Sequence, residues 1–279
     1  MPSVVFKNTS YLSISQGKRP AANQLVAMNT SSIQWTRGLV ACYPMWEAQG
    51  GPIKDYGPNA LADGVVYTNA PTVTNDATMG NHPVGGGNGA GGGTLRAYRI
   101  PWSSTLQMLG EGMSGHNWAI SFWFRSLVTN NPGSDSVIYS FCNTTTPFSG
   151  IAGSMDTSQQ VACNTNGSTL IDAGIKATKN VFTDLAWHHF LFTQTPSASN
   201  NSFSASNKYF VDGAADTTST GGVNSGATTQ DCYLLGNNQG DAPGDCAICD
   251  LRFYKDSTFD LTLAQSLYNQ ATRWELYLI

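Results

Sequence analysis

The sequence predicts an all-β fold in which two antiparallel sheets form a sandwich, with an N-terminal arm and a short C-terminal helix and tail. Composition is the first reason: 11% of the 279 residues are charged, whereas 41% are apolar and 29 are glycine. This balance is typical of many short strands joined by turns. The second reason is that short apolar runs recur between Gly, Pro, Asn and Asp, while only one segment shows a helical period.

Six apolar runs are predicted to form the main strands, because their β-branched and aromatic residues fit a pleated, half-buried surface. Their even spacing is typical of a β-sandwich. A further strand is predicted over Thr94–Ile100. The six runs are Ala119–Phe124, Val137–Phe141, Trp187–Phe192, Lys208–Val211, Cys232–Leu235 and Ala247–Tyr254.

The pattern divides the chain into three segments. Residues 1–36 are polar and irregular, and we expect an arm or outer strands there. Residues 37–268 contain the apolar runs and form the predicted domain. Its last element is a helix over Thr262–Asn269, with Asp260 as the N-cap. Residues 269–279 form an apolar, aromatic tail.

Charge and hydropathy argue against several classes of function. The formal net charge is -4 and no cluster of Lys and Arg occurs, so the chain lacks the basic surface that nucleic acid binding requires. No window of about 18 apolar residues is present, and no membrane span is expected. The segment Met1–Lys7 lacks the features of a secretory signal, so we expect synthesis and folding in a cytoplasm.

The six cysteines are not spaced as a short disulfide framework, and we expect buried free thiols. Cys246 and Cys249 have the spacing of half a zinc site, but no second pair with matching spacing exists. The six are Cys42, Cys142, Cys163, Cys232, Cys246 and Cys249.

Four stretches stand out by their order and spacing. They are Gly38–Glu47 with Asp55–Asn59, Trp118–Arg125, Trp187–Phe190 with Tyr209–Gly213, and Cys249–Tyr254. Together they resemble the laminin-G-like (pentraxin-like) branch of the concanavalin A-like lectin/glucanase superfamily, over residues 37–268. The resemblance implies a jelly roll of two antiparallel sheets with a concave face. Members of the superfamily serve mostly as carbohydrate-binding or protein-binding modules, and some hold calcium.

A sugar-binding surface needs an exposed aromatic ring with polar groups nearby. Trp123 and Trp187 lie within the strand runs and are expected in the core. For any single ring, packing in the core is the competing explanation. The five candidate rings are Tyr43, Trp46, Tyr67, Trp102 and Tyr254.

Calcium is the one cofactor that the sequence suggests. Asp55, Asn59 and Asp63 place hard oxygen ligands in one turn-rich loop, and Asp241 and Asp245 flank another. The alternative is ordinary turn chemistry, in which Asp and Asn side chains bond to nearby backbone. Both explanations stay open from the sequence.

The sequence predicts no enzyme. Glycoside hydrolysis needs two carboxyl groups on opposite sides of the bond, but the three glutamates, Glu47, Glu111 and Glu275, lie far apart and no Glu-x-Asp-x-Glu run occurs. His188 and His189 are neighbours in a strand and point to opposite faces, so they cannot easily chelate one ion. No Gly-x-Ser-x-Gly elbow precedes a helix. A glycan hydrolase is therefore the least favoured function.

The apolar end Thr272–Ile279 is similar to the endings of laminin-G-like structural proteins of tailed phages. We therefore expect a virion protein, either a capsid decoration or a fibre-associated protein, assembled in the host cytoplasm. Its arm and tail would dock on other virion proteins in an oligomeric assembly, while the lectin-like domain would bind host surface glycans. The alternative is a free carbohydrate-binding module or adhesin, extracellular or on a cell surface.

Overall fold

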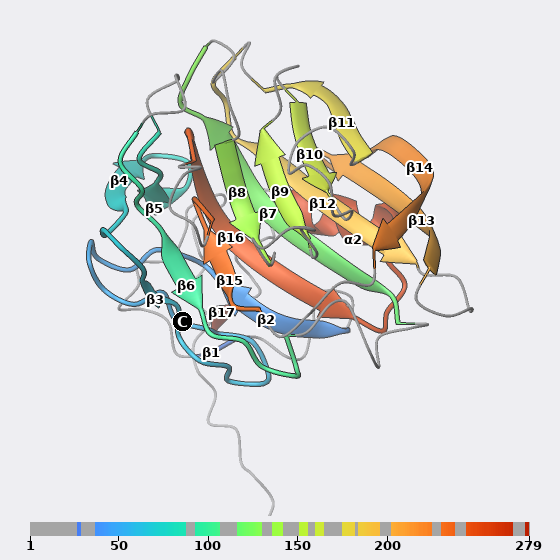
Figure 1. Ribbon diagram of the computed structural model, residues 1–279, viewed down its shortest axis with the longest axis horizontal. Coiled ribbons are helices and arrows are strands. Elements are labelled where there is room, and N and C mark those ends of the chain that lie inside the picture. The colour runs from blue at the N-terminus through green and yellow to red at the C-terminus, as the bar shows by residue number, and fades with distance from the viewer. Residues whose placement is uncertain are drawn as a thin grey trace, which may run out of the picture.

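Two antiparallel β-sheets packed face to face make up the main body of the protein (Figure 1). A short helix and a separate two-stranded sheet complete the described elements. The predicted jelly-roll sandwich with a C-terminal helix is confirmed. The computed structural model describes residues 27–28, 37–87, 93–106, 116–129, 136–141, 151–155, 160–164, 175–181, 184–195, 202–224, 230–237, 244–269 and 277–278.

The smaller sheet has seven strands. In spatial order they are β11 (Ile175–Asn180), β10 (Gln160–Asn164), β9 (Ala152–Met155), β8 (Ser136–Ser140), β15 (Cys232–Leu234), β6 (Tyr98–Ile100) and β3 (Val65–Val66). Strands β8 to β11 follow one another both in the chain and in space. Strand β15 instead returns from far along the chain to pair between β8 and β6. Such long-range returns are typical of Greek-key sandwiches.

The larger sheet has eight strands. Seven lie in the order β14 (Ala214–Asn224), β13 (Ser202–Val211), β12 (His188–Thr195), β7 (Trp118–Ser126), β16 (Cys246–Lys255), β5 (Gly80–Val84) and β4 (Thr72–Asp76). The eighth, β2 (Leu39–Tyr43), pairs with β16. Strand β7 is paired on both sides, with β12 and with β16, and so forms the middle of the sheet.

Side chains of β7 alternate between the two faces of the larger sheet, because successive residues of a strand point to opposite sides. Ile120, Phe122 and Phe124 point between the sheets and belong to the main core. Trp123, on the outer face, is equally buried. The larger sheet is therefore covered on both faces at this strand.

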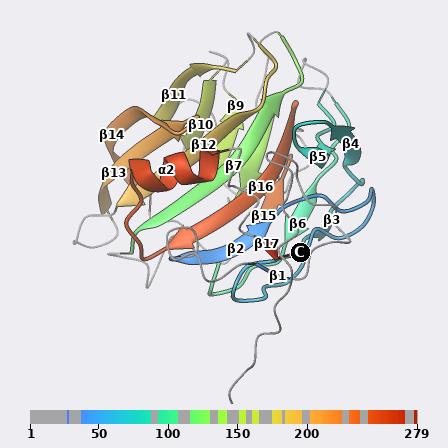
Figure 2. The same cartoon turned by 180° about the vertical axis from the view of Figure 1, so that it is seen from behind.

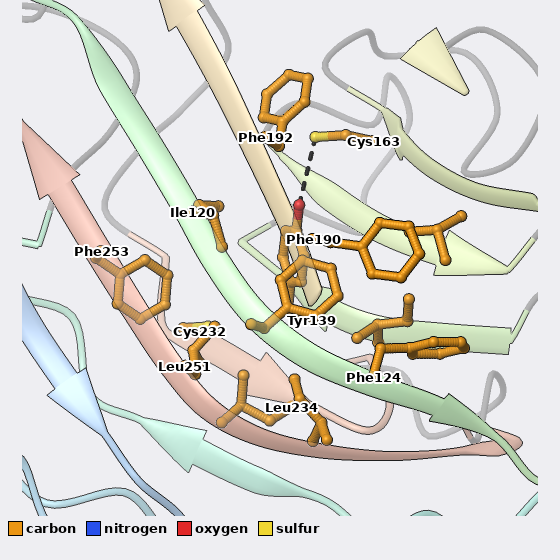
Figure 3. Close-up of a cluster of buried hydrophobic side chains, with 14 of the residues drawn as sticks. Ile120, Phe124, Tyr139, Cys163, Phe190, Phe192, Cys232, Leu234, Leu251 and Phe253 are labelled. Carbon is orange, nitrogen blue, oxygen red and sulfur yellow. Dashed lines mark hydrogen bonds between the residues drawn. The ribbon is translucent and has the colours of Figure 1, made fainter. Parts of the chain in front are cut away.

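The core between the sheets is built from aromatic rings of both sheets (Figure 3). The ring of Phe122 stacks on Phe190 with centroids 5.7 Å apart. It also meets the ring of Tyr139 edge-on at 5.5 Å. The Tyr139 hydroxyl donates a hydrogen bond to Sγ of Cys163 at 3.5 Å, which gives this buried polar group a partner. These contacts join β7 and β12 of the larger sheet to β8 and β10 of the smaller one.

Helix α2 (Leu261–Tyr268) lies across the outer face of the larger sheet (Figure 2). Its N-cap is Asp260, whose side chain accepts a hydrogen bond from the Leu263 amide, as the sequence predicted. Leu263 and Leu267 pack with Leu191 of β12 in a second apolar cluster. Among the described residues, no helix is long and apolar enough to cross a membrane.

The two ends of the chain meet in a small sheet of their own. Strand β1 (Ala27–Met28) pairs antiparallel with β17 (Tyr277–Leu278). Strand β1 lies in the first segment, where the sequence predicts an arm or outer strands. Part of the arm and part of the tail are therefore bound to each other.

The cysteines of the described residues are buried. All five that lie in the described part of the chain form no disulfide, as predicted, whereas Cys142 lies outside the described residues. The five are Cys42, Cys163, Cys232, Cys246 and Cys249.

A buried histidine joins β12 to the hairpin between β13 and β14. Nδ1 of His188 lies 2.7 Å from Oδ2 of Asp212, and its Nε2 lies 3.1 Å from Oδ1 of Asp184. Burial opposes a charge on this ring, but the hydrogen bonds with Asp212 and Asp184 outweigh burial and raise the pKa of His188 above 6.5. His189, on the opposite face, has its Nε2 atom 2.9 Å from Oγ of Ser121. The two histidines thus point to opposite faces, as predicted.

We predict that His188 stabilises the fold most at acidic pH. A group whose folded pKa is raised contributes stability that is present below its unfolded pKa and is lost as the pH rises through the folded pKa. At pH 5, His188→Asn should lower the free energy of unfolding by about 2 kcal/mol, since two charge-assisted hydrogen bonds are lost. Urea unfolding at pH 5, 7 and 9 checks this, with Lys179→Gln as control, because Lys179 is the neighbouring cation that opposes the charge on His188. A wild-type-to-variant difference that is the same at all three pH values would contradict it.

Candidate functional site

Three of the five candidate aromatic rings lie in the core. Tyr43 and Tyr254 are fully buried and Trp46 is 2% exposed. The Tyr43 hydroxyl donates to the carbonyl of Ala62 at 3.1 Å, while Trp46 and Tyr254 share the apolar cluster beneath α2. A ring without access to solvent cannot stack on a sugar. The prediction that these three rings bind ligand is therefore wrong.

The other two candidates lie just after strands β3 and β6 of the smaller sheet. The Tyr67 amide, just after β3, donates to the carbonyl of Ala97 at 2.9 Å, and its ring meets that of Tyr233 edge-on at 4.8 Å. Trp102, just after β6, is 38% exposed. Its amide donates to Oδ1 of Asp231 at 2.7 Å. Tyr67 thus contacts β15 through its ring, and Trp102 contacts the residue just before β15 through its backbone amide.

Strand pairing places an arginine between these aromatic residues. Tyr98 and Ile100 of β6 are core residues, so Arg99 between them points to the outer face. Arg99 is the register partner of Val65 in β3 and of Tyr233 in β15, and side chains at such positions are direct neighbours. We call the surface formed by Val65, Tyr67, Arg99, Trp102, Asp231 and Tyr233 the aromatic patch.

The charged groups of the aromatic patch face each other at the surface. Nε of Arg99 lies 3.7 Å from Oδ2 of Asp231, and their side chains are 42% and 30% exposed. An exposed pair of this kind adds little to stability, so its position is not explained by the needs of the fold. Burial, with Asp231 and Tyr67 nearby, raises the pKa of Tyr233 above 10.0, although Arg99 opposes the rise. The Tyr233 phenol therefore stays protonated near neutral pH.

The aromatic patch offers the two kinds of surface that a sugar requires. The exposed Trp102 ring presents an apolar face with a polar edge, and the C–H face of a pyranose ring packs on such a surface. Arg99 supplies only donors and Asp231 only acceptors, and sugar hydroxyls bond to both.

The sequence missed four members of the aromatic patch: Val65, Arg99, Asp231 and Tyr233. Period-2 alternation in the strands predicted over Thr94–Ile100 and Cys232–Leu235 was the available signal, since it places Arg99 opposite the apolar residues beside it. Which strands pair, and in what register, depends on contacts between distant segments. Alternation alone could not bring these residues together.

The loop of the predicted calcium ligands is organised by its own backbone. Oδ1 of Asp55 accepts hydrogen bonds from the amides of Cys42 and Gly57, and Oδ2 accepts one from Leu61, all at 2.8 Å. Burial raises the pKa of Asp55 above 3.8, although these three hydrogen bonds oppose the rise. Asp55 thus acts as the centre of a turn, which is the alternative that the sequence left open.

Asn59 and Asp63 also act within the protein. Nδ2 of Asn59 donates to the carbonyl of Val40 at 2.8 Å, and Oδ1 of Asp63 accepts from the Asp55 amide at 3.4 Å. In the second predicted loop Asp245 is 2% exposed. Asp241 lies outside the described residues. Within the described part of the chain, no three His, Cys, Asp or Glu side chains gather as metal ligands.

Trp187 belongs to a polar cluster whose side chains contact one another. Its Nε1 donates to Oδ2 of Asp76 at 2.7 Å, and the Arg125 guanidinium lies over its ring at 5.1 Å. His82, which is fully buried, meets the Trp187 ring edge-on at 4.9 Å. These contacts attach the β4–β5 hairpin to β7. Because Asp76, Arg125 and Trp187 contact one another rather than a ligand, we assign this cluster a structural role.

Two antiparallel sheets packed in this arrangement define a lectin-like jelly-roll fold. The chain belongs to the concanavalin A-like lectin/glucanases superfamily, because a model of that superfamily matches residues 103–260, more than half of the chain. Asp231 and Tyr233 lie inside the matched segment, whereas Tyr67, Arg99 and Trp102 precede it. No curated protein sequence matches the chain.

Several solved structures share the fold. The binding domain of Paraclostridial Mosquitocidal Protein 1 is 13% identical with a TM-score of 0.55, over 83% of this chain and 52% of that one. The binding domain of botulinum neurotoxin DC, solved with rat synaptotagmin II, is 11% identical with a TM-score of 0.58, over 84% and 52%. Trypanosoma rangeli sialidase is 14% identical with a TM-score of 0.52, over 90% and 36%. The chain thus spans about half of the toxin domains and about a third of the sialidase, and these likenesses show the fold alone.

We predict that Asp55 stabilises the domain without calcium. Asp55→Ala should lower the free energy of unfolding by about 3 kcal/mol, because three amides lose their acceptor. Asp55→Asn, which keeps one acceptor oxygen, should cost less. Thermal unfolding of the wild type with calcium or with a chelator should give the same melting temperature. A melting temperature that rises with calcium, and does not rise in Asp55→Asn, would contradict this role.

Proposed function

We propose that the protein is a non-enzymatic carbohydrate-binding module whose ligand surface is the aromatic patch. The observation that carries the proposal is the 38% exposure of Trp102. Its amide binds Asp231, two residues before Tyr233, whose ring pairs with that of Tyr67. An indole exposed to this degree leaves part of its face accessible to a ligand. With Arg99 and Asp231 at its side, it provides a platform for a sugar ring and polar groups for the hydroxyls.

The carboxyl groups support binding rather than hydrolysis. Most glycoside hydrolases need two carboxyl groups about 5 to 9.5 Å apart across the bond, and the aromatic patch contains one, Asp231, which is held by the Trp102 amide. Glu47 accepts a hydrogen bond from the Lys54 amide at 3.2 Å and belongs to a different loop. Glu111 and Glu275 lie outside the described residues.

The structural relatives support recognition of a partner at a cell surface. Two of them are binding domains of toxins, and one was solved with the protein synaptotagmin II. We propose host surface glycans as the partner here, because exposed rings with few charges suit a sugar better than a protein loop. A single shallow site of this kind binds weakly, and many copies on one particle would raise the avidity.

We further propose that the domain is displayed on a virus particle, as a capsid decoration or fibre-associated protein assembled in the host cytoplasm. Strands β1 and β17 pair with each other, and each has a second edge that no other described strand occupies. Open edges of this kind accept strands from partner proteins, which supports docking on other virion proteins in an oligomeric assembly. A free module or adhesin, extracellular or on a cell surface, is the alternative and needs no such docking element.

Deletion of β17 distinguishes the virion protein from the free module. Deletion of residues 269–279 is expected to abolish incorporation into particles, because β1 loses its partner, while the sandwich keeps its melting temperature. Mass spectrometry of particles purified on a density gradient measures the ratio of this protein to the major coat protein. Wild-type protein absent from particles would favour the free module, and full incorporation of the truncated protein would exclude docking through the tail.

Trp102→Ala tests the carbohydrate site itself. We expect it to weaken glycan binding about tenfold or more, because central Trp residues carry much of the energy of an interface. Leu261→Ala is the matched control, since Leu261 is 41% exposed on α2, which covers the outer face of the other sheet. Binding is measured on a broad glycan panel, with melting temperatures to verify folding. Wild-type protein that binds no glycan, or equal binding by Trp102→Ala, would overturn the proposal.

A further inference from the structure

The two ends of the Arg99 guanidinium lie in different surroundings. Nε is buried and faces Oδ2 of Asp231 at 3.7 Å, whereas the side chain as a whole is 42% exposed. The exposed part is therefore the terminal edge that carries the two Nη atoms. Within the described residues these Nη atoms make no hydrogen bond.

Other arginines of the sheets use their guanidinium inside the protein. Arg252 binds Asp250 through Nε and Nη2 at 2.7 to 3.0 Å, and both side chains are buried. Arg125 contacts Asp76 and stacks on Trp187. Arg99 is different because its side chain is 42% exposed beside Tyr233, its register partner in β15.

Asp231 lies beside this guanidinium. Its Oδ1 accepts the Trp102 amide, which holds the carboxylate in place, and its Oδ2 lies 3.7 Å from Nε of Arg99. Since Nε is buried and has no hydrogen-bond partner, the guanidinium presents its Nη1 and Nη2 atoms outward as a planar pair of donors. Such a pair matches the two oxygens of a carboxylate, which accept hydrogen bonds and donate none.

We propose that Arg99 makes the aromatic patch selective for glycans that carry a carboxylate, such as those ending in a sialic or uronic acid. This proposal rests on the proposed carbohydrate-binding function and specifies its ligand. The Nη1 and Nη2 atoms bind the two carboxylate oxygens, while the ring of the sugar packs on Trp102. Arginine rather than lysine is required, because an ammonium group does not supply two parallel donors.

The test uses pairs of oligosaccharides that differ only in one acidic group: a neutral form, its sialylated form, its glucuronylated form and its sulfated form. The wild type should bind the sialylated or glucuronylated form about tenfold more tightly than the neutral form, since charge-assisted hydrogen bonds are added. Arg99→Lys and Arg99→Gln should both bring the ratio of the affinities for the carboxylated and neutral forms down to about one, and this ratio is the readout because Arg99 also contacts sugar hydroxyls. Trp102→Ala should weaken binding to every form.

The outcomes separate this proposal from the function on which it rests. Equal binding of neutral and carboxylated forms by the wild type would overturn the role of Arg99 and leave the carbohydrate site standing. A preference retained in Arg99→Lys would show that charge alone suffices and would overturn bidentate recognition. Binding of sulfated but not carboxylated forms would overturn the assignment of the acid. Absence of any glycan binding would overturn both proposals. Equal melting temperatures of the Arg99 variants and the wild type serve as the folding control.

Discussion

The burial of both faces of the larger sheet is the constraint on which the rest of the structure depends. Eight of the nine residues of β7 are buried, and removing apolar surface from water contributes about 25 cal/mol per Å². A strand of this kind must be covered on its outer face as well as in the sandwich core. Helix α2, the β4–β5 hairpin and Trp46 provide that cover. The smaller sheet at β3 and β6 carries exposed side chains on its outer face instead, those of Val65 and Arg99.

The fold could be predicted where local pattern and burial agree. Strands β7, β12 and β16 are rich in aromatic and β-branched residues, and the sequence placed them and the Asp260 cap of α2 close to their observed positions. It did not predict β9 and β14, which consist largely of Ala, Gly, Ser and Thr. Segments rich in Ala, Gly and Ser have little intrinsic strand preference. They form strands because a neighbouring strand provides partners for their backbone hydrogen bonds. The residues that hold β14 in place lie in other strands, such as Thr178, whose amide donates to Asp216 at 2.7 Å.

The candidate site was predictable only in part, for the same physical reason. Exposure of Tyr67 and Trp102 and burial of Tyr43 and Trp46 depend on what covers each face, and an aromatic ring suits either environment. The covering elements are distant in the chain, so the sequence could not sort the five rings. Asp55 shows the same limit. Its oxygens suit calcium or backbone amides equally well, and only the fold of the loop decides between them.

Side chains of β6 alternate between the core and the outer face, so the residues that stabilise the sandwich differ from the one proposed to bind a ligand. Tyr98 and Ile100 are 1% and 0% exposed and pack in the core, whereas Arg99 between them is exposed on the opposite face. Changing Arg99 therefore alters the ligand surface without opening a cavity in the sandwich, and its exposed pair with Asp231 contributes little to folding. With this arrangement, the core residues can stay apolar while the residues on the outer face change. Low sequence identity between proteins of this fold is therefore expected, and the toxin binding domains and the sialidase share it at 11% to 14% identity. Function resides in sites placed on a fold rather than in the fold itself.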